Sequence, residues 1–143
     1  MRKITEAARR WIGTPYMHQQ RMIGVGCDCV NLVIAVGLEL GMLDWTPERF
    51  DRFKGYTRAP NPTKMGEALA IFLEPAPAGA ALQEGDILWI SWRKGLPMHL
   101  AIVGTHEGRL TMIHAFSDAR AVVEHTLDGV WHHRINSVWR FRA

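Results

Sequence analysis

Hydrophobic residues recur at helical spacing in three stretches of the first half of the chain. Over residues 3–12 they return every three to four positions, and this spacing predicts a short amphipathic helix. Residues 28–40 are apolar on nearly every side, which is typical of a central helix. Asp28 is well suited to cap this helix, and Gly41 to end it. A third helix, again amphipathic, is expected over residues 64–73.

The central helix has one narrow side on which polar residues occur. Asn31, Ala35 and Glu39 follow one another at four-residue spacing and are predicted to face solvent. Cys29 lies roughly opposite this stripe. Because Asp28 is the expected cap, Cys29 falls in the first helical turn, where the backbone N–H groups have no partner within the helix.

The second half of the chain changes to strand-like runs separated by turn residues. Five strands are predicted, over residues 86–92, 99–104, 110–115, 121–125 and 137–141. Long irregular connections are expected over residues 16–26 and 44–62, the second with a helical turn near residues 47–50. Helices followed by an antiparallel sheet indicate an α+β fold. Since neither half carries a convincing core of its own, residues 1–143 are expected to form a single domain.

Composition agrees with an ordinary globular protein. Of the 143 residues, 48% are hydrophobic and 22% are charged, a balance that is usual for soluble domains. No apolar run approaches the length of a membrane span, so membrane insertion is not expected. The N-terminus lacks the uninterrupted apolar segment of a secretory signal. We therefore expect synthesis in the cytoplasm without a signal peptide.

The positive charge is small and scattered. The net charge is +3, and the one mild basic cluster, formed by Arg134, Arg140 and Arg142, is interpreted as a solvated edge strand. Neither a basic aromatic stripe nor a known nucleic-acid motif is present in the sequence. Nucleic acid is therefore not an expected partner.

The two cysteines, Cys27 and Cys29, are too close in sequence for an unstrained disulfide. Cys29, at the start of a helix, gains from the positive end of the helix dipole, which favours thiolate over thiol. The adjacent Asp28 carboxylate acts in the opposite direction. A histidine partner is therefore required to hold an ion pair with the sulfur and to protonate a leaving amine.

A predicted hairpin supplies that histidine. If the strands at 99–104 and 110–115 close at Gly104 and Arg109, His99 lies directly opposite His114 on one sheet face. Packed against the central helix, this face would join Cys29 as nucleophile, His99 as general base and acid, and His114 as the group that fixes the tautomer of His99. A loop with an odd number of residues would place the two imidazoles on opposite faces. Surface or loop positions are expected for the remaining histidines, His18, His106, His125, His132 and His133.

Two other interpretations use the same residues. A lone buried cysteine is usually a small hydrophobic side chain in the core. Alternatively, Cys27, Cys29, His99 and His114 would together supply the ligands of a zinc site. A zinc site requires both cysteines to point the same way from the tight start of a helix, which is unfavourable. We rank a thiol hydrolase above the zinc site and expect no metal.

Five short sequence blocks occur in the order and approximate spacing of NlpC/P60 cysteine peptidases. They are Gly13-Thr14-Pro15-Tyr16, Asp28-Cys29-Val30-Asn31-Leu32, Gly85-Asp86-Ile87-Leu88-Trp89, His99-Leu100-Ala101-Ile102-Val103 and Ile113-His114-Ala115. The chain resembles this family over nearly its whole length. It is most similar to the phage-type branch encoded with tail genes in prophages and gene transfer agents, in which Gly26-Cys27-Asp28-Cys29 is a familiar opening.

The resemblance implies a papain-like α+β fold and hydrolysis of peptidoglycan stem peptides, often at the D-γ-glutamyl-diaminopimelate bond, without a cofactor. It assigns the nucleophile to Cys29, the base to His99 and the orienting residue to His114. Tyr16 matches a family tyrosine that lies near the nucleophile and helps to bind substrate or the oxyanion; the plainer alternative is a loop aromatic that fills the core. The backbone N–H of Cys29 is a natural oxyanion donor. Phage tail proteins are the implied partners.

Two departures from the family pattern support a second hypothesis. The usual Asp-Cys-Ser-Gly-Leu is replaced here by Asp28-Cys29-Val30-Asn31-Leu32, and the glycines after the Pro-Tyr motif are replaced by Met17-His18-Gln19-Gln20. The alternative is a structural tail-assembly module that keeps the fold with little or no hydrolytic activity. Rapid alkylation by iodoacetamide near neutral pH would indicate an activated thiolate and therefore the enzyme.

Overall fold

The structure, a computed structural model, describes residues 2–44, 46–49, 62–91 and 97–142. Its helices are α1 (Arg2–Arg9), α2 (Cys29–Glu39), α4 (Pro62–Phe72) and the short α5 (Gly129–His132). A small hairpin joins β1 (Arg21–Met22) to β2 (Gly26–Cys27). The larger sheet contains β3 (Leu73–Pro75), β4 (Ile87–Ser91), β5 (Pro97–His106), β6 (Arg109–Phe116), β7 (Ala121–Thr126) and β8 (Ile135–Phe141).

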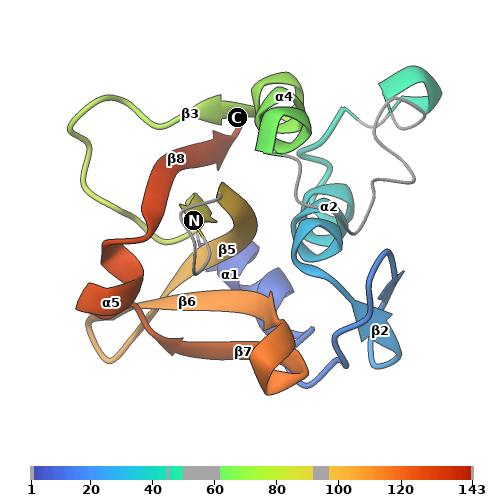
Figure 1. Cartoon of the computed structure of the whole chain (residues 1–143), viewed down its shortest axis with the longest axis horizontal. Helices are drawn as coiled ribbons and strands as arrows, with labels where there is room; N and C mark the ends of the chain where they lie inside the picture. The colour runs from blue at the N-terminus through green and yellow to red at the C-terminus, as the bar shows by residue number, and fades with distance from the viewer. Residues whose placement is uncertain (1, 45, 50–61, 92–96, 143) are drawn as a thin grey trace.

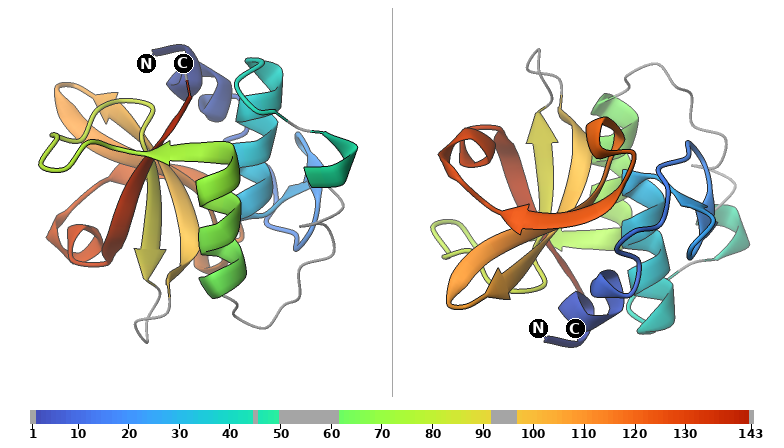
Figure 2. Two further views of the ribbon diagram at one scale, coloured as in Figure 1. Left: turned by 90° about the horizontal axis from the view of Figure 1, so that it is seen from above. Right: turned by 90° about the horizontal axis from the view of Figure 1, so that it is seen from below.

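The larger sheet is antiparallel at every pairing, with strand order β3-β8-β4-β5-β6-β7. Helices α2 and α4 stand side by side against it, and α5 lies at the other end of the molecule (Figure 1; Figure 2). The predicted α+β class is therefore confirmed. Within the described residues, no helix is long and apolar enough to cross a membrane.

The sheet has an apolar cluster on each face. The helical face joins Leu100, Ile102 and Ile113 of the sheet to buried side chains of α1, α2 and α4. The opposite face joins Leu88, Ile90, Ala101, Val103 and Met112 to Leu127, with Trp131 of α5 packed against them. Because strand side chains alternate between faces, each strand of the centre contributes to both clusters.

The central helix forms as its sequence predicts, apart from its polar side. The Asp28 side chain accepts a hydrogen bond from the Asn31 backbone N–H and so caps α2. The helix ends before Gly41, whose φ of 65° is a left-handed conformation that favours glycine. The expectation that Asn31 faces solvent is wrong: it is buried, because its side-chain amide also donates to Asp28.

The five predicted strands and the three predicted helices all occur, with ends shifted by a few residues. The helical turn predicted near 47–50 is present at residues 47–49, whereas residues 50–61 and the predicted turn at Lys94-Gly95 lie outside the described residues. Three short elements were not expected, namely the β1–β2 hairpin inside the predicted loop 16–26, β3, and α5. Each is too short to show a period of its own.

The β5–β6 hairpin has a different register from the one predicted. His106 pairs with Arg109 around a two-residue turn, so the hairpin is longer and Gly104 pairs with Thr111. The predicted direct pairing of His99 with His114 is therefore wrong by two residues. A shift of two positions preserves the face on which each side chain lies. The histidines consequently remain on one face as diagonal neighbours. This face carries Met112 and Trp131, whereas α1, α2 and α4 pack on the other, so the expectation that the histidine face packs against the central helix is wrong.

The expectation of a solvated basic edge is also wrong. β8 lies between β3 and β4, inside the sheet. Arg140 donates to the buried Asp86 carboxylate at 2.9 Å, and the Arg142 guanidinium donates to carbonyls at the end of α4. Arg134 lies over the Trp131 ring, 5.1 Å from its centroid. These three side chains have intramolecular partners and do not form a common basic surface.

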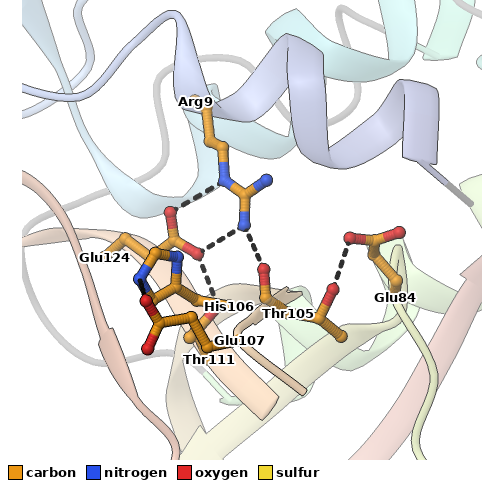
Figure 3. Close-up of polar contacts among 7 residues, drawn as sticks. All are labelled: Arg9, Glu84, Thr105, His106, Glu107, Thr111 and Glu124. Carbon is orange, nitrogen blue, oxygen red and sulfur yellow. Dashed lines mark hydrogen bonds and ion pairs between the residues drawn. The ribbon is translucent and has the colours of Figure 1, made fainter. Parts of the chain in front are cut away.

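A charged network, here called the Arg9 network, ties α1 to the helical face of β5, β6 and β7 (Figure 3). Arg9 donates to both oxygens of Glu124, at 2.9 and 2.8 Å, and to the Thr105 carbonyl. The Thr111 hydroxyl also donates to Glu124. Gly104 provides the space, because a Cβ there would lie 2.8 Å from the Thr111 hydroxyl and 3.1 Å from the Glu124 carboxylate.

Candidate active site

Cys29 is the first residue of α2, and its sulfur lies against β5. The backbone N–H groups of Leu100, the residue that follows His99, and of Val30 and Cys29 itself lie near enough to the sulfur to lower its pKa. Its exposed fraction is 9%, compared with 0% for Cys27. Cys29 therefore lies at the rim of the core, whereas Cys27 is fully enclosed.

The resting sulfur of Cys29 is a thiol. Burial raises its pKa to about 12, and the neighbouring Asp28 carboxylate acts in the same direction. The three N–H groups around the sulfur lower the pKa, but their effect is smaller than that of burial. The helix start therefore prepares a site for negative charge without ionising the thiol beforehand.

His99 and His114 meet edge to face on adjacent strands. His99 Nε2 lies 2.6 Å from His114 Nδ1, and the ring centroids are 4.8 Å apart. Both side chains are buried, His114 completely. The predicted pairing of the two imidazoles is thus present, although the strand register that produces it is diagonal.

Both imidazoles are neutral near pH 7. Burial lowers the pKa of His99 to about 4, with a further contribution from His125. Burial also lowers the pKa of His114 to about 2, and proximity to His99 and His125 adds to this shift. Burial disfavours the charged forms of both the Cys29 sulfur and the His99 ring, so folding acts against the expected cysteine–histidine ion pair, which stays a prediction.

A third histidine extends this pair, and its predicted place as a surface or loop residue is wrong. His125 is half-buried on β7, where its Nε2 lies 2.8 Å from His114 Nε2 and its Nδ1 lies 3.0 Å from the Thr126 carbonyl. His99, His114 and His125 together are here called the histidine row. Trp131 of α5 packs on two of its rings, 5.3 Å from His114 and 5.5 Å from His125 between centroids.

Sequence reasoning missed His125 because its face depends on the pairing of β6 with β7. In that pairing His114 lies opposite Val123 and His125 lies opposite Met112, so the two histidines are diagonal neighbours on one face. The sequence pattern that indicated a cluster was one histidine in each of three consecutive predicted strands. Without the registers, that signal does not determine which side chains meet.

Tyr16 lies beside the nucleophile, as predicted. Its segment forms a bridge with Cys27, and its backbone N–H donates to the Arg120 carbonyl. Burial, with smaller contributions from the nearby Cys29 and Asp28, raises the pKa of the half-buried phenol to about 12. The ring also packs against the core, so the structural role considered for Tyr16 is present as well.

The residues that depart from the NlpC/P60 pattern are arranged around Asp28. The Asn31 amide donates to one carboxylate oxygen at 3.0 Å, and the Gln19 backbone N–H donates to the other at 2.7 Å. His18 Nδ1 lies 3.9 Å from the second oxygen. These residues hold the cap of α2 in place.

The side chains proposed as zinc ligands are engaged with other groups. Cys27 donates to the Asp28 carbonyl at 3.2 Å and is part of the core, and the facing nitrogens of His99 and His114 contact each other. Among the described residues, no group of three or more histidine, cysteine or acidic side chains is arranged to hold a metal. Both cysteines are free thiols.

Comparison with solved structures identifies the fold. The NlpC/P60 domain of the peptidoglycan hydrolase SagA aligns with 97% of this chain and 96% of its own length, at a TM-score of 0.55 and 20% identity. An NLP/P60-family protein similar to lipoprotein, from Staphylococcus aureus, aligns with 99% of this chain at a TM-score of 0.61 and 18% identity. The chain has the fold of NlpC/P60 domains.

An N-acetylmuramoyl-L-alanine amidase from Bacteroides uniformis aligns with 99% of this chain and 98% of its own length, at a TM-score of 0.56 and 15% identity. The chain spans 41% of the length of the Staphylococcus aureus protein. No protein-family model matches the sequence, and no curated protein matches it. At these identities the likeness concerns the fold.

Proposed function

We propose that the protein is a cysteine peptidase that hydrolyses stem peptides of peptidoglycan. The observation that carries the proposal is the position of the Cys29 sulfur, at a helix N-terminus and against the residue that follows His99, whose ring pairs with His114. Similarity to the fold of a peptidoglycan hydrolase and of an amidase supports the same substrate class.

The first step is proton transfer from the Cys29 thiol to His99. With its pKa lowered to about 4, His99 is unprotonated near neutral pH and available as a base. As the proton moves, the sulfur attacks the carbonyl carbon of the scissile bond. The N–H groups that already face the sulfur stabilise negative charge at the start of α2.

The second step expels the amine. The tetrahedral oxyanion accepts a hydrogen bond from the backbone N–H of Cys29, and Tyr16 lies close enough to the nucleophile to contribute to substrate binding. Protonated His99 returns its proton to the leaving nitrogen, and a thioester to Cys29 remains. Water, deprotonated by His99, then releases the acid and restores the thiol.

The altered residues around Cys29 are compatible with this chemistry. Asn31 and Gln19 bind Asp28, and neither replaces a group of the histidine pair. The hypothesis of an inactive assembly module was based on these substitutions. The side-chain bond of Asn31 accounts for that substitution through the helix cap, whereas Gln19 binds Asp28 only through its backbone N–H.

Release of muropeptides from purified sacculi, measured by liquid chromatography and mass spectrometry, tests the proposal. Cys29→Ala should reduce release to background while the protein stays folded. Cys27→Ala is the matched control, because it removes a thiol two residues away that points into the core. Release that persists in Cys29→Ala, or is lost equally in both variants, would contradict the nucleophile assignment.

Trapping of the thioester replaces alkylation as the test against the inactive module. Since the pKa of Cys29 is raised to about 12, slow reaction with iodoacetamide is expected even from an active enzyme. Mass spectrometry after rapid quenching should instead show a stem-peptide acyl group on Cys29. A folded wild-type protein that forms neither adduct nor product would support the inactive module.

The bond proposed for cleavage is the D-γ-glutamyl-diaminopimelate bond, on the basis of the family resemblance of the motifs around Cys29 and His99. Defined stem peptides distinguish this bond from the others, because each cleavage gives fragments of different mass. Release of the intact stem from muramic acid would indicate an amidase instead and would overturn the assignment of the bond.

Delivery by a phage-like tail is proposed from the resemblance of Gly26-Cys27-Asp28-Cys29 to the tail-associated branch. In this view the chain is made in the cytoplasm and is incorporated into a tail that carries it to the wall. Immunoblotting of purified particles tests the proposal. Absence of the protein from particles that contain the other tail components would contradict it.

A further inference from the structure

We propose that His125 is a positioning residue that determines, through His114, which ring nitrogen of His99 carries a proton. The three rings form a continuous hydrogen-bonded row across β5, β6 and β7 (Figure 1). The row ends at the Thr126 carbonyl, 3.0 Å from His125 Nδ1. This end determines the arrangement of protons along the whole row.

A carbonyl oxygen accepts hydrogen bonds and cannot donate them. His125 Nδ1 must therefore carry the proton in its contact with Thr126, and in the neutral ring Nε2 is left as an acceptor. His114 then donates from Nε2 to His125, which leaves His114 Nδ1 as an acceptor. His99 in turn donates from Nε2 to His114. The result is a neutral His99 with its proton on Nε2 and an unprotonated Nδ1.

The opposite arrangement is unfavourable at one point only. If His99 carried its proton on Nδ1, His114 would donate from Nδ1 and His125 from Nε2. His125 Nδ1 would then face the Thr126 carbonyl as a second acceptor, and two acceptors at that distance repel. Of these two chains of hydrogen bonds, the Thr126 carbonyl therefore favours the one in which His125 donates from Nδ1.

The role of the His99 tautomer in catalysis rests on the proposed function and adds detail to it. The unprotonated Nδ1 of His99 is the nitrogen that can receive the Cys29 proton, because Nε2 is occupied by its bond to His114. When Nδ1 becomes protonated, Nε2 continues to donate to His114. No other proton in the row has to move, so the charged state of His99 uses the same hydrogen bonds as the neutral state.

Packing holds the row in this geometry. Trp131 contacts His114 and His125, and Phe116 stacks on His114 with centroids 4.9 Å apart. Trp131 is itself fixed by the N-cap of α5, where Asp128 accepts a hydrogen bond from its backbone N–H. The aromatic contacts orient the rings, and the Thr126 carbonyl determines their tautomers.

The resting protein can report these tautomers without any substrate. In protein labelled with ¹⁵N-histidine, long-range ¹H–¹⁵N spectra at pH 8 distinguish a protonated ring nitrogen from a bare one. The expected pattern is a proton on Nε2 of His99, on Nε2 of His114 and on Nδ1 of His125. A proton on Nδ1 of His99 in the wild type would overturn the proposal, whether or not the protein proves to be a hydrolase.

Two substitutions separate hydrogen bonding from packing. His125→Gln keeps an oxygen that can accept from His114 Nε2, whereas His125→Phe keeps the contacts with Trp131 and Phe116 and removes the acceptor. His125→Phe should shift the protons of His114 and His99 towards Nδ1 and lower kcat about 10- to 100-fold, with KM little changed. His125→Gln should retain the wild-type tautomers and most of kcat.

His106→Phe is the control, because His106 is exposed at the far end of β5. It should change neither the tautomers nor kcat. Equal effects of His125→Gln and His125→Phe, or wild-type tautomers in His125→Phe, would contradict the positioning role. If the wild type shows the expected tautomers but cleaves no stem peptide, the proposed function fails and the assignment of protons stands.

Discussion

The two faces of β5, β6 and β7 carry two polar networks of opposite character. On the helical face the Arg9 network joins charged groups, and on the other face the histidine row joins three imidazole rings. Glu124 and His125 are consecutive residues of β7 and belong to different networks because successive side chains point to opposite faces. The same three strands thus support an ion pair on one face and a row of hydrogen-bonded imidazoles on the other.

The pKa shifts show what each network favours. Hydrogen bonding to Glu124 raises the pKa of Arg9, and hydrogen bonding to Arg9 lowers the pKa of Glu124, so folding favours the charged forms. Burial lowers the pKa values of His99 and His114, so folding favours their neutral forms. The ion pair contributes to stability, whereas burial keeps His99 and His114 unprotonated and makes each of them a weaker base than a free imidazole.

The largest effect is expected from His99. His99→Gln removes the ring that accepts the Cys29 proton and should lower kcat about 10²- to 10⁴-fold, the usual contribution of a general base. Muropeptide release under saturating substrate measures it, and thermal unfolding checks that the fold is kept. A near wild-type kcat in the His99→Gln variant would show that the histidine row takes no part in catalysis.

His114 should have a smaller effect than His99. His114→Leu leaves His99 Nε2 without its buried acceptor, so kcat should fall about 10- to 100-fold. His114→Gln offers an amide oxygen to the same nitrogen and should recover part of the rate. The difference in kcat between the two variants measures how much the hydrogen bond that orients His99 contributes, separately from proton transfer by His99. If both variants lose activity to the same extent, hydrogen bonding is not the role of His114.

Much of this site follows from the sequence, and the missing part has a definite physical cause. Cys29 is placed by its local helix signals, Asp28 and the apolar run after it. His99 and His114 are placed by strand patterns in adjacent segments, and their shared face survives a register error of two residues. His125 and Trp131 depend on the β6–β7 register and on a four-residue helix, which local patterns do not determine. Asn31 is buried where its side chain contacts both the cap residue Asp28 and Arg21 of β1, and the contact with β1 does not follow from the helical period.

The Arg9 network should affect stability and leave catalysis unchanged. Arg9→Met leaves the Glu124 carboxylate with the Thr111 hydroxyl but without its charged partner. We expect a loss of about 1 kcal/mol in the free energy of unfolding, a modest value because solvent screens the partly exposed Arg9. Urea unfolding measures the loss, and kcat for stem-peptide cleavage should match the wild type. A large fall in kcat would show that the two faces are coupled.

Acid titration should separate the networks by a change in the slope of stability against pH. The unfolded chain binds protons at histidine below its ordinary pKa of 6.5, whereas folded His99 does not until about pH 4. Stability should therefore fall as the pH drops from 6.5 to 4, and His99→Gln should flatten that fall. The pKa of Glu124 is lowered from 4.5, so its contribution to stability is present above that pH and is lost below it. Arg9→Met should therefore lower the curve by a constant amount above pH 4.5 and change its slope only below that pH. Urea unfolding across this pH range tests both slopes.

The two-residue turn at Glu107-Gly108 has a consequence far from where it lies. Its first residue, Glu107, is eight residues from His99, about 26 Å along the strand, yet the turn fixes which β6 residues lie beside the start of β5. One extra residue in this turn would rotate the face of one strand relative to the other and direct His114 towards the helices. A change in the length of this surface turn would therefore disrupt the histidine row as much as the loss of one imidazole, although the turn lies far from the row.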